Sequence, residues 1–192
     1  MPDVHVAAVC GSLKDDSATR KALRPALDAA ADHGATTDMI DLRDLDLAPL
    51  DPDAAATDGA DDLTDRVRAA DSVLLGTPMY HGSYSSPMKA ALDHCGFDEF
   101  EETTVGLLAV SGGAFPITAL DHLRSVCRAL NAWVIPHQAA VPHAGEQFDG
   151  EGRFEDEGLE QRSRTLGRRA VEYAHIEPDP PNPESLENVG AE

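Results

Sequence analysis

Short apolar runs alternate with segments of helical periodicity along most of this 192-residue chain, and this alternation restricts the fold more than any other feature. The apolar runs predict strands over residues 4–10, 36–42, 72–77, 103–111 and 132–136. The periodic segments predict helices over residues 17–33, 61–70, 85–95, 116–130 and 159–174, with an Asp-, Pro- and Ala-rich loop over 44–59. Strands and helices that alternate at such short intervals form right-handed βαβ units, a parallel sheet and a layer of helices on each face.

The predicted fold class is therefore α/β, a flavodoxin-like three-layer sandwich around a five-stranded parallel sheet of order 2-1-3-4-5. Pro78 is expected to end the third strand and Pro136 the fifth. One domain should span residues 1–175, followed by an acidic, proline-rich and disordered tail over residues 176–192. Ligands of such sheets bind beyond the carboxyl ends of the strands, so three segments become candidates: residues 11–19, 78–86 and 111–116.

The chain is strongly acidic, with 35 aspartates and glutamates against 15 lysines and arginines, and a net charge of −20. Its only lysines are Lys14, Lys21 and Lys89, and the acids are spread along the whole sequence. Such a surface repels the phosphates of DNA and RNA, so no nucleic acid partner is expected. This composition is typical of halophilic proteins and indicates a haloarchaeal source, with an acidic mesophilic protein as the alternative.

No run of about 18 apolar residues is present, so no membrane-spanning segment is predicted. The first residues lack the basic start and apolar core of an export signal, which favours a cytoplasmic location. The three cysteines, Cys10, Cys95 and Cys127, show no metal-binding spacing, so we expect buried thiols, a reducing compartment and no metal ligands. A reactive thiol is the alternative for one of them.

The first candidate segment, G-S-L-K-D-D-S-A-T-R from residue 11, leaves a predicted strand and enters a predicted helix. It combines hydroxyls, a cation and the free N–H groups of a helix start, which suit a phosphate; the residues concerned are Ser12, Lys14, Ser17, Ala18 and Thr19. Neither G-x-x-x-x-G-K-[ST] nor G-x-G-x-x-G is present, so the phosphate of a mononucleotide is expected. The alternative is that Ser17 is only a helix N-cap.

This segment follows the pattern G-S-x-[RK]-x-x-S-x-[NT] and resembles the phosphate loop of the NADPH-dependent FMN reductases, which include azoreductase- and quinone-reductase-type proteins. Lys14 stands where that family usually has arginine, and Thr19 where it often has asparagine. Both residues can bind phosphate, although lysine gives up the bidentate geometry of arginine. The resemblance extends over about residues 4 to 140 and implies FMN as the cofactor.

The second segment, T-P-M-Y-H-G-S-Y-S-S-P-M-K-A-A-L-D from residue 77, resembles the family motif P-x-Y-x-G-S-x-x-x-x-[LM]-K-x-x-L-D. The resemblance implies that this loop wraps the isoalloxazine ring and that its binding residues are Pro78, Met79, Tyr80, His81, Gly82 and Ser83. Glycine at position 82 lets the backbone approach a flat ring. Tyr80 either lines the site or contacts a partner subunit, and His81 is either a proton donor or an ordinary surface histidine.

The third segment, S-G-G-A-F-P from residue 111, directly follows a predicted strand. Paired glycines at a strand end allow the backbone to approach a ligand closely. The family has a similar segment beside the pyrimidine side of the flavin, so the resemblance implies that Ser111, Gly112 and Gly113 bind the cofactor. The alternative is an ordinary turn between a strand and a helix.

The helix predicted over residues 85–95 carries small and apolar residues, Met88, Ala91 and Leu92, beside the second segment. Proteins that this chain resembles are dimers or dimers of dimers, so a homodimer or homotetramer is expected. Lys89 and Asp93 are spaced i, i+4 and form either a surface ion pair or a contact between subunits.

The resemblance implies an oxidoreductase that moves a hydride from NADPH or NADH to bound FMN and passes the electrons to a small-molecule acceptor, such as flavin or quinone. Because hydride chemistry belongs to the cofactors, no catalytic side chain is predicted. A non-enzymatic flavodoxin-like electron carrier is the alternative, although the T/S-x-T-G-x-T phosphate loop of that class is absent. A flavin-binding regulatory module is a third class.

Overall fold

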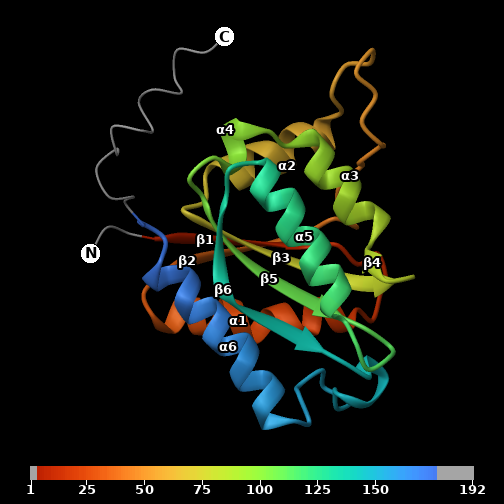
Figure 1. Cartoon of the computed structure of the whole chain (residues 1–192), viewed down its shortest axis with the longest axis vertical. Helices are drawn as coiled ribbons and strands as arrows, with labels where there is room; N and C mark the ends of the chain where they lie inside the picture. The colour runs from red at the N-terminus through yellow and green to blue at the C-terminus, as the bar shows by residue number, and fades with distance from the viewer. Residues whose placement is uncertain (1–3, 177–192) are drawn as a thin grey trace.

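The structure, a computed structural model, describes residues 4–176 and has the predicted α/β architecture (Figure 1). The sheet has five parallel strands: β1 (His5–Cys10), β2 (Thr36–Asp41), β3 (Ser72–Tyr80), β5 (Thr104–Val110) and β6 (Trp133–Val141). Their order, β2-β1-β3-β5-β6, confirms the predicted 2-1-3-4-5, because β4 (Ser83–Tyr84) is only a short antiparallel addition to β3. From residue 177 on, the predicted tail lies outside the described residues, and the domain boundary stays a prediction.

Helices cover both faces of the sheet (Figure 1). One face carries α1 (Ala18–Asp32) and α6 (Glu157–Glu172). The other carries α2 (Asp58–Arg68), α3 (Ser86–His94), the short α4 (Phe97–Phe100) and α5 (Ile117–Ala129). A single 3-10 turn, η1 (Ala144–Glu146), follows β6. None of the helices within residues 4–176 is long and apolar enough to cross a membrane.

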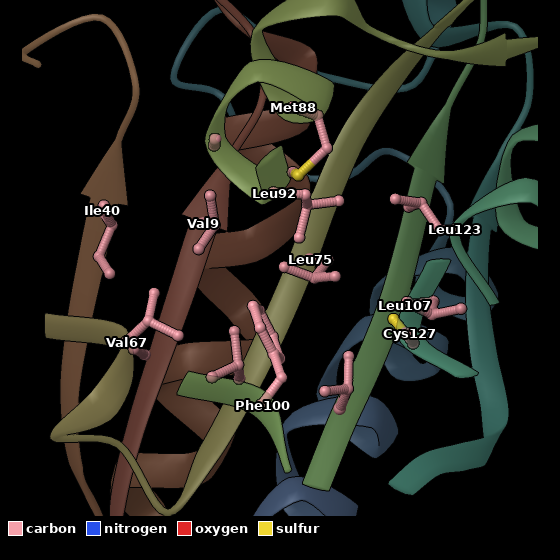
Figure 2. Close-up of a cluster of buried hydrophobic side chains, with 14 of the residues drawn as sticks. Val9, Ile40, Val67, Leu75, Met88, Leu92, Phe100, Leu107, Leu123 and Cys127 are labelled. Carbon is pink, nitrogen blue, oxygen red and sulfur yellow. The ribbon is translucent and has the colours of Figure 1, made fainter. Parts of the chain in front are cut away.

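The core consists of two apolar layers, one on each side of the sheet. Successive side chains of a strand point to opposite faces, so Val9 of β1 joins one layer while Ala8 joins the other. Figure 2 shows Val9, Leu75 and Leu107 of three neighbouring strands beneath the helices on one face. Strands buried on both faces need continuous apolar runs, and this is why the sequence shows runs rather than alternation.

The prediction that Pro78 ends the third strand is wrong, since β3 continues to Tyr80. Two residues earlier, the Gly76 carbonyl faces β1 and accepts a hydrogen bond from the Gly11 N–H at 2.8 Å. The backbone N and C=O of Pro78 point to the same side of β3 as those of Gly76, but β1 has already ended there. Proline therefore loses no hydrogen bond there, and β3 stays paired with β5 as far as Val110.

The prediction that the last strand ends at Pro136 is also wrong, since β6 runs on to Val141. The pairing with β5 shifts between Val105 and Leu107, which pair with Val134 and Gln138. Pro136 thus lies in a bulge on an edge strand, where a missing N–H is tolerated.

The second helix starts earlier than the predicted residue 61. Thr57 caps α2, with its Oγ1 accepting from the Ala60 N–H at 3.3 Å, so the helix begins at Asp58. Gly59, predicted in the preceding loop, lies inside the helix; a Cβ there would meet the Asp46 carbonyl oxygen at 2.7 Å. Glycine at this position lets the helix start lie against the β2–α2 loop.

The apolar residues of α3 do not face outward as expected for a subunit contact. Met88, Ala91 and Leu92 are all less than a tenth exposed and belong to the core of the chain itself. Cys10 and Cys127 are buried as predicted, whereas Cys95 is only partly buried. Loss of solvation raises the pKa of Cys95 and of Cys127 to about 12. Burial also raises the pKa of Cys10, so none of the three has the lowered pKa of a reactive thiol.

Candidate functional site

The loops that follow β1, β3 and β5 meet at one edge of the sheet, where the strand order reverses. The chain leaves β1 toward β2 on one side and returns to β3 on the other, which leaves a crevice between the loops. A cavity of about 740 Å³ lies there and is lined by all three predicted segments. A second hollow of about 440 Å³, on the other side of the first loop, is lined mainly by the β2–α2 loop.

Ser17 ends the first loop and starts α1. Its backbone is extended, and its Oγ accepts a hydrogen bond from the Arg20 N–H at 3.1 Å, so Ser17 is the helix N-cap. That bond uses a lone pair of the oxygen and leaves the O–H free to donate. The N–H groups of Ala18 and Thr19 precede the first bonded N–H of the helix, where the helix dipole is positive. Capping and anion binding are therefore compatible at this serine.

The charges around the first loop are arranged in pairs. Three ion pairs with N–O distances of 2.5 to 2.6 Å join loop or strand acids to cations: Asp15–Arg43, Asp16–Lys21 and Asp41–Arg20. The hydrogen bond from Lys21 lowers the pKa of Asp16. Within residues 4–176, Lys14 has no carboxylate partner, so its ammonium stays available to an anion in the cavity that it lines.

A buried serine that the sequence analysis did not select, Ser85, joins the first two loops. Its O–H donates to the Gly11 carbonyl at 2.6 Å, and its own N–H donates to Thr77 Oγ1 at 2.9 Å. The same Oγ accepts from the Met88 N–H at 3.3 Å and caps α3. One side chain thus fixes the distance between the phosphate-type loop and the loop after β3.

The second segment forms a two-residue hairpin rather than an open loop. His81 (φ 50°) and Gly82 (φ 83°) occupy the turn between β3 and β4, as the twist of a tight hairpin requires. The hairpin contacts α5, where the Ser83 Oγ lies 2.9 Å from Nδ1 of His122. Met79 and Tyr80 line the cavity from the strand, whereas the turn itself lies beyond it.

The third loop is fastened to the chain after β6. The Ser111 O–H donates to the Gly113 carbonyl at 2.6 Å, which closes the turn. The His143 N–H donates to the same Gly113 carbonyl at 3.1 Å, and the Ala144 N–H donates to the Ser111 carbonyl at 2.9 Å. Gly112 faces open space, because a Cβ built on it would meet no atom within 4 Å.

The structure brings most of the predicted site residues to one cavity. Nine of them line it: Ser12, Lys14, Ala18, Thr19, Pro78, Met79, Tyr80, Ser111 and Gly112. The other five lie in the same loops without lining it: Ser17, His81, Gly82, Ser83 and Gly113. Their roles toward a ligand stay predictions.

The family model for NADPH-dependent FMN reductases matches residues 4–146, which is most of the chain. The chain belongs to this family. An FMN-dependent NADPH-azoreductase of Staphylococcus aureus is 32% identical over 179 residues, covering 88% of this chain and 95% of that protein. The family that the first two motifs indicated is thereby confirmed.

Solved structures resemble the chain in fold. The flavoenzyme NAD(P)H:(acceptor) oxidoreductase FerB of Paracoccus denitrificans is 22% identical, with a TM-score of 0.74 over 89% of this chain and 97% of its own. A flavodoxin from the domain Archaea is 12% identical, with a TM-score of 0.63 over 89% of this chain and 99% of its own. These likenesses confirm the flavodoxin-like architecture.

The reductase family name implies FMN, and the residues of the cavity fit this group. Ser12, Ser17 and Thr19 are buried hydroxyl residues at its phosphate-type end, beside free helix N–H groups. At the other end, the bare backbone of Gly112 borders space that a side chain would fill. A volume of about 740 Å³ lies within the range of about 300–1,000 Å³ that is usual for such ligands.

Part of the cavity wall escaped the sequence analysis. The missed lining residues are Asp16, Lys21, Val110, Ala144, Gly145, Phe148, Asp149 and Gly150. Five of these follow β6, which we had ended at Pro136, so the segment was never placed at the carboxyl edge. The apolar pattern at Ile135, Ala139 and Val141 was the available signal for a longer strand.

Proposed function

We propose that this chain binds FMN in the cavity between its three loops, reduces it with NADPH or NADH, and passes the electrons to a small-molecule acceptor. Membership of the NADPH-dependent FMN reductases supports the reaction class. The observation that carries the site assignment is the phosphate-type end of the cavity. There the free N–H groups of α1 and buried hydroxyls converge with the ammonium of Lys14, which has no carboxylate partner within residues 4–176, in an otherwise acidic protein.

When bound, FMN supplies the redox chemistry, since its flavin ring accepts a hydride from a nicotinamide and returns electrons to a second substrate. The chain binds and orients this group. Lys14, Ser12 and Thr19 would hold the phosphate, while Met79 and Tyr80 would border the ring from β3. Gly112, which lines the cavity without a side chain, would leave room for the ring. No side chain is assigned a proton transfer, in agreement with cofactor-based hydride chemistry.

A direct test is to purify the chain in molar KCl and identify the bound flavin by its absorbance spectrum. Under anaerobic conditions, NADPH or NADH should bleach the flavin, and an added quinone, azo dye or free flavin should restore the colour. A non-enzymatic electron carrier would be bleached by dithionite but not by either nucleotide. That outcome, or a protein that binds no flavin when reconstituted with FMN, would refute the proposal.

We infer that the chain works as a homodimer or homotetramer. Two large apolar side chains are exposed in the loops at this edge of the sheet: Tyr80, which lines the cavity, is 59% exposed, and Phe115, in the loop after β5, is 80% exposed. A groove of about 400 Å³ between α3 and α5 adds the partly exposed Val126 and Leu130 to the apolar surface available to a second copy. Light scattering in molar KCl should give at least twice the mass of one chain, 20.4 kDa; a single-chain mass would contradict the inference.

Adaptation to high salt is a further part of the proposal, with a cytoplasmic, haloarchaeal setting. A net charge of −20 on 192 residues makes the surface repel itself. The screening length falls from about 10 Å at 0.1 M to about 3 Å at 1 M salt, so the melting temperature should rise between these concentrations of KCl. A melting temperature that does not change over this range would oppose a halophilic origin.

A further inference from the structure

The chain between β6 and α6, residues 144–154, forms a compact turn beside the cofactor cavity. Phe148 and Phe154 pair across an antiparallel bridge, with ring centroids 4.6 Å apart. The Asp149 carboxylate accepts from the N–H groups of Glu151 and Arg153 at 2.9 Å and from the Arg153 guanidinium. The turn is therefore internally bonded, and the charge of Asp149 is engaged within it although this residue lines the cavity.

Lys21 lies between this turn and the first loop. Its side chain is only 20% exposed, which is low for a lysine. The ammonium lies 2.6 Å from the Asp16 carboxylate and 5.7 Å from the centre of the Phe148 ring. Gly152 has a φ of +79°, and a Cβ there would lie 3.2 Å from Cε of Lys21, so the missing side chain lets the lysine pass closely. One side chain thus contacts both the first loop and the 144–154 turn.

The same contacts close one end of the cavity. Asp16, Lys21 and Gly150 line the cofactor cavity and also a smaller polar pocket of about 230 Å³ behind it. They form the wall that separates the two spaces at the phosphate-type end. Within this wall, Lys21 is joined to Asp16 by the ion pair and also contacts the Phe148 ring.

We propose that Lys21 is a positioning residue that latches the 144–154 turn to the first loop and thereby closes the phosphate end of the FMN site. The proposal rests on the proposed function, because it takes FMN as the ligand. Residues 147–154 lie beyond the stretch that the family model matches, so this wall is argued from the contacts of the chain itself.

Direct binding of the phosphate by Lys21 is the alternative to this role, and the two roles predict opposite effects of Asp16→Asn on FMN binding. If Lys21 is a latch, Asp16→Asn breaks it and FMN leaves faster, although the variant removes a negative charge near the phosphate. If Lys21 is a phosphate ligand held back by Asp16, the same variant frees its charge and FMN binds more tightly. The direction of the Asp16→Asn effect therefore separates the two roles.

The experiment measures the dissociation rate of FMN by the return of flavin fluorescence, at one fixed KCl concentration. Lys21→Met loses both the ion pair and the cation–π contact and should raise the rate by about 3- to 10-fold. Asp16→Asn loses only the ion pair and should raise it by about 1.5- to 5-fold. Lys21→Arg keeps both contacts and should stay within about twofold of the wild type. Arg24→Met is the matched control: it removes a positive charge one turn along α1, from an exposed residue without an ion-pair partner within residues 4–176.

Amide hydrogen exchange in the FMN-free protein gives a second readout. The Gly152 and Glu155 N–H groups donate to carbonyls of the turn, those of Asp149 and Gln147. Both should exchange faster in Lys21→Met and Asp16→Asn than in Arg24→Met. Failure of the wild type to bind FMN would overturn the proposed function. A wild type that binds FMN beside a Lys21→Met variant that behaves like Arg24→Met would overturn the latch alone, and so would tighter binding by Asp16→Asn.

Discussion

Replacing Ser85 by alanine should destabilise the fold and loosen the cofactor site at the same time. The Ser85 hydroxyl donates to the buried Gly11 carbonyl and caps α3 through the Met88 N–H. Loss of an N-cap costs about 1 kcal/mol. A buried carbonyl left without a donor costs about 1–3 kcal/mol. Because Ser85→Ala incurs both losses, we expect the free energy of unfolding to fall by about 2–4 kcal/mol.

Denaturant unfolding of the FMN-free protein at fixed KCl measures this change, with Ser86→Ala as the control. Ser86 is the exposed neighbour on the first turn of α3, so its variant should stay within about 0.5 kcal/mol of the wild type. The FMN dissociation constant should rise severalfold in Ser85→Ala only, because Gly11 directly precedes the residues that we propose to bind the phosphate. Equal stability of the two variants would refute the view that Ser85 fastens the loops together.

Three further predictions test other parts of the molecule. Gly112→Val should abolish FMN binding without unfolding the chain, because its side chain would fill open space beside the cavity; a fluorescence titration, with circular dichroism to confirm folding, checks this. Changing Ser12 and Ser17 together to alanine should weaken FMN binding by about 1–3 kcal/mol, and an unchanged dissociation constant would contradict the phosphate assignment. The Arg66 guanidinium donates to Asp38 and holds the pKa of that carboxyl below its usual range. The stabilisation that this ion pair gives the fold is therefore present above about pH 4 and is lost as the pH falls further. Asp38→Asn should therefore lower stability by less than about 1 kcal/mol at pH 7, and unfolding curves should converge with the wild type in acid.

The sheet could be predicted well because buried parallel strands need apolar residues on both faces, and these appear in the sequence as short continuous apolar runs. The errors lie at two prolines, Pro78 and Pro136, where a local rule was applied without knowing the neighbouring strand. At Pro78 the neighbour had already ended, and at Pro136 the strand lies at an edge and bulges. Whether a proline ends a strand depends on what its missing N–H would have faced, which only the assembled sheet decides.

The same error explains what was missed at the site. The first two motifs located the loops after β1 and β3, because their residue types match the chemistry of a phosphate and a close backbone. The 144–154 turn has no such motif, and its position follows only from the true end of β6 at Val141. Ser85 was missed for a related reason, since its importance comes from the Gly11 carbonyl, 74 residues away in the chain.

An acidic protein repels an anionic cofactor, so binding of the FMN phosphate needs positive charge close to the site. Residues 11–24 hold four cations, Lys14, Arg20, Lys21 and Arg24, against two acids, Asp15 and Asp16, so this segment has a net charge of +2 within a chain of −20. At low salt the distant acids still repel a phosphate, because screening extends over about 10 Å at 0.1 M. At 1 M salt, screening extends over about 3 Å, so the repulsion by distant acids disappears while contacts at hydrogen-bond distance are reduced less.

The affinity for FMN should therefore rise between about 0.1 M and about 1 M KCl. This trend is opposite to the usual weakening of phosphate binding by salt. Fluorescence titrations at several KCl concentrations measure this dependence, with circular dichroism to confirm that the chain stays folded at each one. Affinity that falls steadily with salt in a folded protein would show that the local cations, and not the distant acids, dominate the field at the site.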